Sequence, residues 1–350
     1  MKIGLLTDTH WGVRGSSDIF RDYFKWWYET EFFPTLKERG ITEIIHAGDF
    51  CDNRIALNLK DIEAIQHHFV PLLEQYDMRM HLALGNHDVA YRNTNKINCG
   101  SIFENCKNVI VYEDAVNVLN DSVCLVPWIN KENEEATLKH MASTKAKICI
   151  GHFEIRGLRM NKQVINENGL EQKVFDNFDL TLSGHFHHKN SVGKIHYVGN
   201  PFHLNWGDFG EERGFHILDT ETQELEFIEN ETCLFDLIEY DEELDYSNIV
   251  DDMKEIAYLR VLVENKTSET KFSKFLALLK EVKANVDIID HTKIAIDQRE
   301  VKVENIEMTD PLEFCTKYLK EAGNETTPEM QILLQDLVSR ANEKVALKKG

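Results

Sequence analysis

Short apolar runs of branched residues recur through the first two-thirds of the sequence and alternate with longer segments of helical periodicity. The composition of these runs is typical of buried strands. They lie at residues 2–7, 43–47, 80–84, 122–126, 146–150 and 180–183. Helices are predicted at residues 18–37 and 59–75, the first with aromatic side chains at helical spacing that we expect to pack in the core. The alternation predicts an α/β fold whose functional loops follow the carboxyl ends of the strands.

Polar motifs follow most of these predicted strands, and glycine precedes four of the five. In chain order they are Asp8-Thr9-His10, Gly48-Asp49, Gly85-Asn86-His87-Asp88, Gly151-His152 and Gly184-His185-Phe186-His187. Glycine lets the backbone approach an ion closely. Because loops beyond strand ends converge on one edge of an open α/β sheet, we expect these side chains to meet.

The side chains in these motifs suit a pair of divalent cations. Asp49 offers two oxygens and can bridge two ions. Two cations held ~3.5–4 Å apart would activate a bound water and neutralise charge that builds on phosphate oxygens. A mixture of carboxylate, amide and imidazole ligands favours manganese or iron, also fits zinc, and excludes an all-thiolate site.

Histidine alone is weak evidence, since the chain has 15 of them and most histidines are surface or core residues. The following keep that ordinary interpretation: His67, His68, His140, His188, His216 and His291. The joint occurrence of five motifs, each after a strand, is what indicates a metal site.

The charge of the chain limits how it can bind a polyanion. Its formal net charge is −21, from 60 acidic and 39 basic side chains. A protein that grips nucleic acid alone is normally basic. Either metals recruit the phosphate while the acids lie elsewhere, or a partner supplies most of the binding.

The seven cysteines are scattered and form no C-x-x-C pair, which is typical of reduced thiols. The apolar run at the N-terminus is too short for a signal peptide, and no stretch has the roughly 18 apolar residues of a membrane span. We therefore expect a cytoplasmic protein without a membrane segment.

The last third of the chain predicts a second domain and a helical tail. After a strand-like segment at residues 214–218, the acidic stretch 236–252 precedes a predicted strand, helix and strand at 258–263, 270–282 and 286–296. Two further helices are predicted to begin at Pro311 and Pro328. The second is amphipathic, and packs either on its own domain or on a partner.

The motif order resembles that of the calcineurin-like metallophosphoesterase superfamily, across residues 1–205. The resemblance implies a β-sandwich flanked by helices that carries a binuclear metal centre. By position, one metal would be held by Asp8, His10, Asp49 and His187, and the other by Asp49, Asn86, His152 and His185. His87 would be a catalytic residue over the scissile phosphate, with Asp88 orienting its ring.

Within the superfamily, the chain is most similar to DNA repair and recombination nuclease subunits of the SbcD type. Three features carry this narrower resemblance: the segment 48–52, the segment 197–201 followed by Gly214-Phe215, and the small domain after the core. It implies residues 1–235 as a nuclease core, 236–305 as an α+β capping domain that recognises DNA, and 306–350 as helices that bind a partner. It also implies manganese-dependent exonuclease action on duplex ends, endonuclease action on single strands, an SMC-like coiled-coil P-loop ATPase as partner, and a homodimer.

Three points stay open from the sequence. The chain could instead act on small phosphodiesters or phosphoproteins, or be a scaffold that has lost its metals. Asp52 stands where archaeal and eukaryotic members of the nuclease family have histidine, so the balance between exonuclease and endonuclease action is undecided. Finally, some bases could contact DNA or be solvated surface charges: Arg14, Arg54, Arg92 and Lys189.

Overall fold

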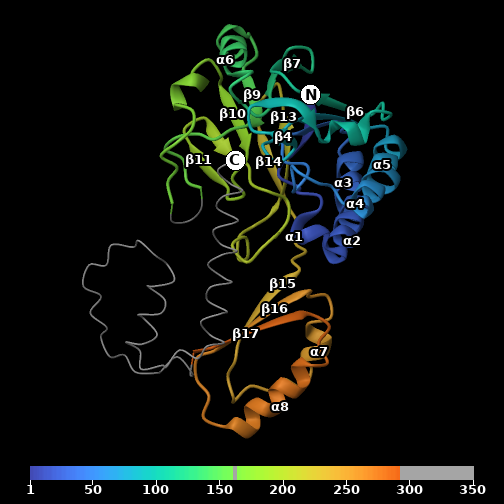
Figure 1. Ribbon diagram of the computed structural model, residues 1–350, viewed down its shortest axis with the longest axis vertical. Coiled ribbons are helices and arrows are strands. Elements are labelled where there is room, and N and C mark those ends of the chain that lie inside the picture. Colours follow the sequence, from blue (N-terminus) through green and yellow to red (C-terminus); the bar gives the residue numbers. More distant parts are fainter. Residues whose placement is uncertain (161–163, 292–350) are drawn as a thin grey trace, which may run out of the picture. The chain divides into compact units, whose positions relative to one another are not determined.

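The computed structural model describes residues 1–160 and 164–291 (Figure 1). The described residues form two compact units, one of residues 1–238, 245–261 and 273–287, and the other of residues 239–244, 262–272 and 288–291. The predicted helices at Pro311 and Pro328, and the end of the strand predicted at 286–296, lie outside the described residues. The domain boundaries near residues 235 and 305 stay predictions.

The first sheet of the larger unit has six strands. Its order is β14 (Leu225–Glu229), β13 (Gly214–Asp219), β1 (Lys2–Leu6), β2 (Glu43–His46), β3 (Arg79–Ala83) and β6 (Val109–Tyr112). Strands β1, β2, β3 and β6 are parallel, while β13 and β14 add antiparallel. The carboxyl ends of β1, β2 and β3 therefore lie at one edge.

The second sheet also has six strands. Its order is β11 (Asn190–Val192), β12 (Ile195–Tyr197), β10 (Leu180–Gly184), β9 (Ile148–His152), β8 (Val123–Val126) and β7 (Val116–Val118). The four inner strands β12, β10, β9 and β8 are parallel, and β11 and β7 pair antiparallel at the two edges.

The two sheets pack face to face, and alternate side chains of their strands fill different cores. In β8, Val123 and Leu125 join Ile3 and Leu5 of β1 in the core between the sheets. The intervening Cys124 packs in the outer core of the second sheet. Because both faces are covered, the strands are mostly apolar, which is why the sequence shows nearly continuous runs. The predicted α/β sandwich is confirmed.

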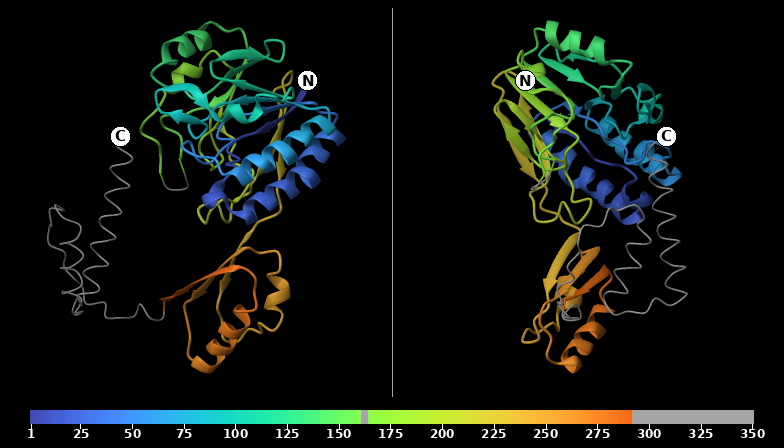
Figure 2. Two further views of the ribbon diagram at one scale, coloured as in Figure 1. Left: turned by 45° about the vertical axis from the view of Figure 1, so that its right-hand side comes forward. Right: turned by 60° about the vertical axis from the view of Figure 1, so that its left-hand side comes forward.

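Two long helical segments cover the outer face of the first sheet, where the sequence predicts helices (Figure 2). They are α2 (Asp18–Trp27) continuing through the π-helical turn η1 (Tyr28–Phe32) into α3 (Phe33–Glu38), and α4 (Leu59–Ala64) continuing through η2 (Ile65–Phe69) into α5 (Val70–Gln75). Each π turn directly precedes a segment with proline, Pro34 or Pro71. Proline lacks an amide hydrogen and crowds the carbonyl four residues earlier, and a widened turn relieves both problems.

Shorter elements lie between the strands and helices of residues 1–229. They are α1 (Val13–Ser16), β4 (Val89–Tyr91), β5 (Thr94–Asn98), η3 (Cys99–Phe103), α6 (Glu134–Ser143) and η4 (Gln172–Phe175). Helix α6 packs on the outer face of the second sheet through Met141. None of the helices among the described residues has the length and apolar character to cross a membrane.

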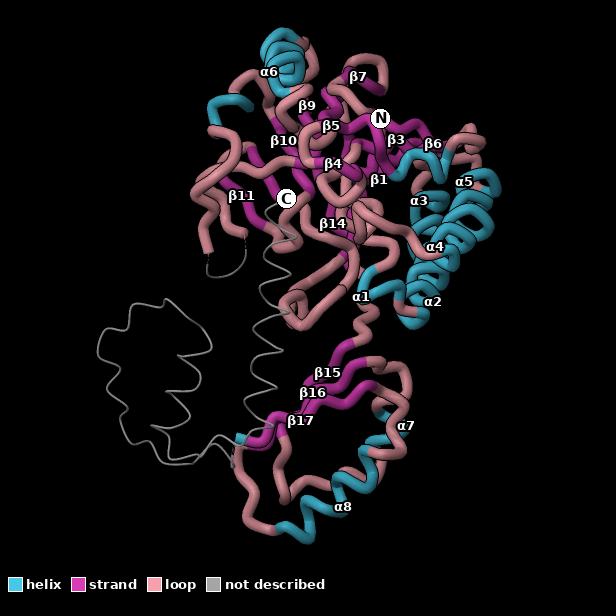
Figure 3. Tube along the Cα trace, in the orientation of Figure 1, coloured by secondary structure: helices cyan, strands magenta, loops and turns pink. Residues whose placement is uncertain are grey.

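A separate three-stranded sheet follows in the chain (Figure 3). Its order is β15 (Phe235–Glu239), β16 (Tyr258–Val263) and β17 (Asn285–Asp290), and the connections hold α7 (Ile249–Asp252) and α8 (Glu269–Leu279). The predicted strand, helix and strand correspond to β16, α8 and β17. Strand β15 was not predicted, because it lies in the acidic stretch.

Candidate metal centre

All seven predicted ligands lie at the carboxyl ends of strands from both sheets. Asp8 and His10 follow β1, Asp49 follows β2, and Asn86 follows β3. His152 is the last residue of β9, and the remaining two histidines follow β10. These segments come from positions up to 179 residues apart in the chain, and they meet because the sheets align their strand ends.

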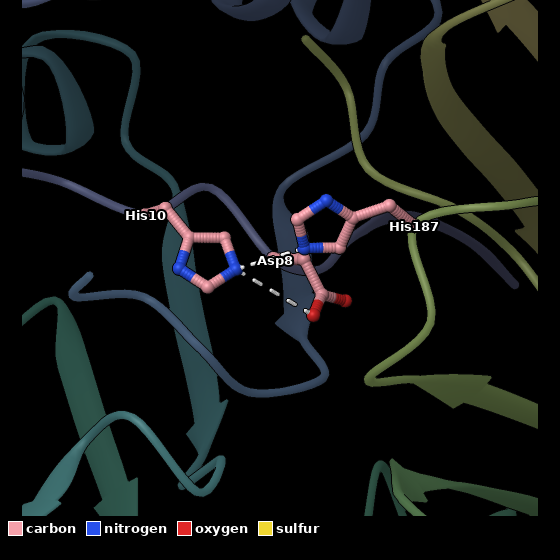
Figure 4. A group of neighbouring side chains, drawn as sticks. All are labelled: Asp8, His10 and His187. Carbon is pink, nitrogen blue, oxygen red and sulfur yellow. Dashed lines mark hydrogen bonds and ion pairs between the residues drawn. The ribbon is translucent and has the colours of Figure 1, made fainter. Parts of the chain in front are cut away.

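Asp8, His10 and His187 form the first group of predicted ligands (Figure 4). The Nε2 atoms of His10 and His187 face each other at 3.1 Å, and His10 Nε2 lies 3.9 Å from Asp8 Oδ1. One atom from each of the three residues lies within 4.8 Å of the others. These are nitrogen and oxygen donors directed at a common point.

Asp49, His152 and His185 form the second group, which Asn86 completes. His152 Nε2 lies 3.2 Å from Asp49 Oδ2, and the Asn86 amide oxygen lies 3.1 Å from His152 Nε2 and 2.9 Å from His185 Nδ1. Asp49 Oδ2 is also 4.0 Å from His10 Nε2 of the first group. Asp49 thus lies between the two groups, where a bridging ligand is needed.

The backbone around these ligands is strained. Asp8, His10, Asp49 and His185 all have left-handed backbone conformations, with φ of 52°, 51°, 53° and 91°. Such conformations cost on the order of 1–3 kcal/mol each for non-glycine residues and gather at functional sites. The strain indicates that the fold holds these four side chains in place against local preference.

Close backbone approach explains the glycines of two motifs. A Cβ atom at Gly184 would overlap the Thr7 hydroxyl, and a Cβ atom at Gly85 would overlap the backbone nitrogen of Asp49. Neither glycine has a left-handed φ, so conformational freedom does not explain glycine at these positions. The missing Cβ atoms instead let neighbouring strand ends come together at the ligands.

The electrostatics of the two groups fit divalent cations. The Asp8 and Asp49 side chains are almost fully buried, and the ion-pair partners of these two acids among the described residues are histidines. Although burial alone would raise it, the pKa of Asp49 is held below its usual value by His152. Burial lowers the pKa of His185 to about 4, so its ring is neutral and can donate a lone pair to a metal. Although burial alone would lower both, nearby acids raise the pKa of His10 and bring the pKa of His152 to about 9. Protons on these two rings therefore balance the buried carboxylates in the metal-free chain, and divalent cations would take over that role on binding.

Further contacts orient the ligand rings. His152 Nδ1 donates to the Ala47 carbonyl oxygen at 2.9 Å, which leaves Nε2 as the nitrogen that could bind a metal. His10 Nδ1 lies 3.4 Å from Asp52 Oδ1. Metal-binding histidines usually have such partners at the second ring nitrogen. The sequence left the role of Asp52 open. In this geometry its carboxylate contacts the His10 ring.

Buried polar residues also surround His187, and sequence reasoning missed their role. Asp208 Oδ1 lies 3.7 Å from His187 Nδ1, and the Asn200 amide lies 3.3 Å from it. Arg213 donates to Asn200 Oδ1 at 2.6 Å and to the His187 carbonyl oxygen. Asn200 belongs to the 197–201 segment that carried the narrower family resemblance, which was the available signal.

His87 lies beside both groups, but its ring partner differs from the expected one. Its backbone N–H donates to Asp49 Oδ1 at 2.7 Å, and its Nδ1 lies 2.5 Å from the Asp52 carbonyl oxygen. The Asp88 carboxylate instead accepts hydrogen bonds from the backbone N–H groups of three residues, Phe50, Cys51 and Gly85. Asp88 thus ties together the loops after β2 and β3, while the His87 ring contacts the Asp52 main chain.

Two cavities open beside the ligands. One of about 390 Å³ is lined by His152, and another of about 540 Å³ is lined by His185 and His187. Of the bases considered for DNA contact, Lys189 pairs with Glu212 at 2.9 Å and Arg14 donates to the Leu204 carbonyl oxygen. The side chains of Lys189 and Arg14 are therefore already bound to other groups of the protein.

Two packed sheets whose strand ends bring together buried carboxylates, an amide and imidazoles define the class of metal-dependent phosphoesterases. The chain belongs to the calcineurin-like phosphoesterase family, whose model matches residues 1–189. This confirms the resemblance drawn from the motifs, and the protein is a metal-dependent phosphodiesterase.

A curated relative matches nearly the whole chain. Exonuclease subunit 1 of Enterobacteria phage T4 is 29% identical over 344 residues, which cover 96% of this chain and 97% of that protein. This similarity agrees with the narrower resemblance to SbcD-type nuclease subunits. Among solved structures, an archaeal phosphodiesterase matches with 16% identity and a TM-score of 0.32, over 66% of this chain and 100% of its own. A dimetal phosphatase from Danio rerio matches with 10% identity and a TM-score of 0.38, over 62% and 91%.

Proposed function

We propose that the protein is the nuclease subunit of a DNA repair or recombination complex and cleaves DNA phosphodiester bonds with two divalent cations. The observation that carries the proposal is the position of Asp49 between two groups of donors. Asp8, His10 and His187 would hold one cation, and Asn86, His152 and His185 would hold the other. The donor set suits manganese or iron, and we propose manganese because the resemblance to SbcD-type nucleases implies it.

When bound, the two cations supply an activated water and neutralise charge on the phosphate. The protein's own residues fix the geometry of this reaction. Asp49 sets the spacing of the ions, and the rings of His10 and His152 are oriented by Asp52 and the Ala47 carbonyl. Because these contacts already exist in the folded chain, the donors need no rearrangement.

His87 is the proton-transfer residue in this proposal. A carbonyl oxygen can only accept a hydrogen bond, so His87 Nδ1 carries the hydrogen that points to Asp52. The proton that changes in catalysis is therefore on Nε2. From there it passes to the oxygen that leaves the phosphate.

DNA as substrate and a second subunit are supported by the T4 relative, which is named an exonuclease subunit and matches end to end. The net charge of −21 supports a partner that contributes DNA affinity. We propose an SMC-like ATPase for this role. We also propose a homodimer formed through the helix that begins at Asp18. The proposed location is the cytoplasm, which for a phage protein is that of the host.

The proposal is tested by incubating the purified protein with manganese and three substrates: linear duplex DNA, single-stranded DNA and a chromogenic phosphodiester. Cleavage of DNA that a chelator abolishes supports it, and products from ends or from internal sites show the exonuclease and endonuclease balance. Hydrolysis of the small ester alone would replace it with the alternative of a small-substrate phosphodiesterase.

A further inference from the structure

A cavity of about 390 Å³ lies on the side of the metal centre where His152 is found. Its volume is in the range of small-molecule binding sites. It is lined by Arg92, Trp128, Ile129, Asn130, Lys131, Glu134, His152, Phe153, Glu154, Gly169 and Leu170. A ligand in it would therefore lie against the phosphate-binding region.

Trp128 is an aromatic residue of this cavity that lies beside the metal centre. Its ring is half-buried, and its centroid lies 5.4 Å from that of His185 and 6.0 Å from that of His152. The indole is thus next to two predicted ligands of the same cation.

The main chain of Trp128 is fixed on both sides. Its N–H donates to the Leu84 carbonyl oxygen at 2.6 Å, which ties it to the end of β3. Its carbonyl oxygen accepts from the side-chain amides of Asn95 at 3.0 Å and Asn133 at 3.1 Å. An aromatic face held in this way loses little entropy when a ligand stacks on it.

Two positively charged side chains at the same cavity are available to a ligand. Arg92 and Lys131 are exposed, and within the described ranges 1–160 and 164–291 neither forms an ion pair. Arg14 and Lys189, by contrast, are engaged with other residues. Glu134 and Glu154 also line the cavity, so its charges are balanced and phosphate attraction alone does not explain it.

Resting on the proposed nuclease function, we propose that this cavity is a subsite for an unpaired nucleobase next to the scissile phosphate. The base stacks on Trp128, while Arg92 and Lys131 contact the neighbouring phosphates. Stacking on aromatic side chains accepts every base, because each has a π face. A base within a duplex is covered by its neighbours, so the strand must be single or frayed at the position cleaved.

The test uses a single-stranded pentanucleotide with one cleavable phosphodiester, its other linkages being nuclease-resistant phosphorothioates. Two further versions lack the base on one side or the other of that phosphodiester. They identify the nucleotide that enters the subsite. For the wild type, loss of that base raises KM about tenfold, and Trp128→Ala raises KM for the intact substrate by a similar factor. Combining the two changes raises KM no further, because both remove the same contact.

Penalties that multiply, or a Trp128→Ala enzyme with wild-type KM, overturn the proposal. If the Trp128 ring only supports His185, the KM effects of base removal and Trp128→Ala should multiply, and Trp128→Ala should bind manganese more weakly in calorimetry. If the ring stacks on a base, manganese binding should be the same in Trp128→Ala and the wild type. Trp128→Phe restores most of the affinity, and Trp128→Leu replaces the alanine variant if that one fails to fold.

A matched pair of lysines tests the charged part of the subsite. Lys131→Ala lowers the salt dependence of KM, while Lys139→Ala, an exposed lysine of α6 outside the cavity, keeps it. Equal effects of the two variants contradict the role of Lys131. A wild-type enzyme that hydrolyses the chromogenic ester but no oligonucleotide removes the proposed function itself, and is distinct from a nuclease that is indifferent to Trp128.

Discussion

At the scale of single residues, the donor atoms of the centre follow from local motifs, whereas their supports do not. Asp8, His10 and Asp49 each follow a strand that the sequence marks by its apolar run, so their meeting was predictable. The contact of Asp208 and Arg213 with His187 joins segments more than 20 residues apart that share no pattern. Tertiary contacts of this kind are visible only once the chain is folded.

His87→Ala tests the assignment of proton transfer. The variant loses the ring that contacts the Asp52 carbonyl, but it keeps the backbone N–H that binds Asp49. We expect turnover to fall by about 10²–10⁴-fold, the usual contribution of a general acid. Elemental analysis should find the same metal content as in the wild type. A variant without metal would show that His87 is a ligand.

Asp52→Asn tests the support of His10. The carboxylate lies 3.4 Å from His10 Nδ1, and an amide of the same size removes its charge. Loss of such an outer contact typically costs about 10–100-fold in metal affinity. Titration calorimetry with Mn²⁺ measures the change, and Asp176→Asn, an exposed acid, is the control. Equal Mn²⁺ affinity in the wild type and Asp52→Asn would refute the role.

At the scale of elements, the sequence reveals the central strands and conceals the outer ones. Strands β1, β2, β8, β9 and β10 are covered on both faces and are therefore mostly apolar. Edge strands such as β14, and the β4–β5 hairpin, expose part of each face and mix polar with apolar residues. Their pairing depends on a neighbour that supplies hydrogen bonds, so composition alone does not mark them.

The packing of α2 on α4 includes a buried ion pair that offers a test. Arg21 Nη1 lies 2.7 Å from Asp61 Oδ1, and both side chains are nearly inaccessible to solvent. Arg21→Met leaves a buried, unpaired carboxylate, which should lower the free energy of unfolding by about 3–5 kcal/mol. Replacing both residues, as Arg21→Met with Asp61→Leu, should restore most of the loss. Urea unfolding measures each variant.

The matched control for this pair is Arg39→Met. Arg39 pairs with Glu226 at 2.9 Å, but both side chains are about 40% exposed. Exposed pairs contribute about 1 kcal/mol or less. If the two arginine variants lose equal stability, the cost of burying Asp61 has been misjudged.

At the scale of the whole molecule, acid should destabilise the fold partly through His216 of β13. Burial lowers the pKa of this histidine to about 4, below the unfolded value of about 6.5. The unfolded chain therefore binds an extra proton between these pH values, and the free energy of unfolding falls as pH falls from about 6.5 to about 4. From pH 7 to 5 the loss from this group is about 2 kcal/mol.

His216→Phe should remove that part of the pH dependence, because a phenyl ring fits beside Phe227 and does not titrate. Urea unfolding of the metal-free protein at pH 7 and pH 5 measures it. His67→Gln, a change at an exposed position, keeps the wild-type profile. An unchanged pH dependence in His216→Phe would show that other groups account for the acid sensitivity.

Divalent cations should stabilise the larger unit as a whole, because its two sheets meet at the proposed ligands. Mn²⁺ at about a hundredfold excess over Kd adds about 2.7 kcal/mol per site, or roughly 5–10 °C in Tm for a domain of this size. Chelation reverses the shift. Asp49→Asn weakens both sites, since Asp49 lies between the two donor groups. It should therefore lose most of the Mn²⁺-dependent gain in Tm, whereas a variant affecting one site, such as His187→Ala, should lose about half. Equal gains in Tm for Asp49→Asn and the wild type would mean that the cations bind elsewhere, and that the geometry around Asp49 serves another purpose.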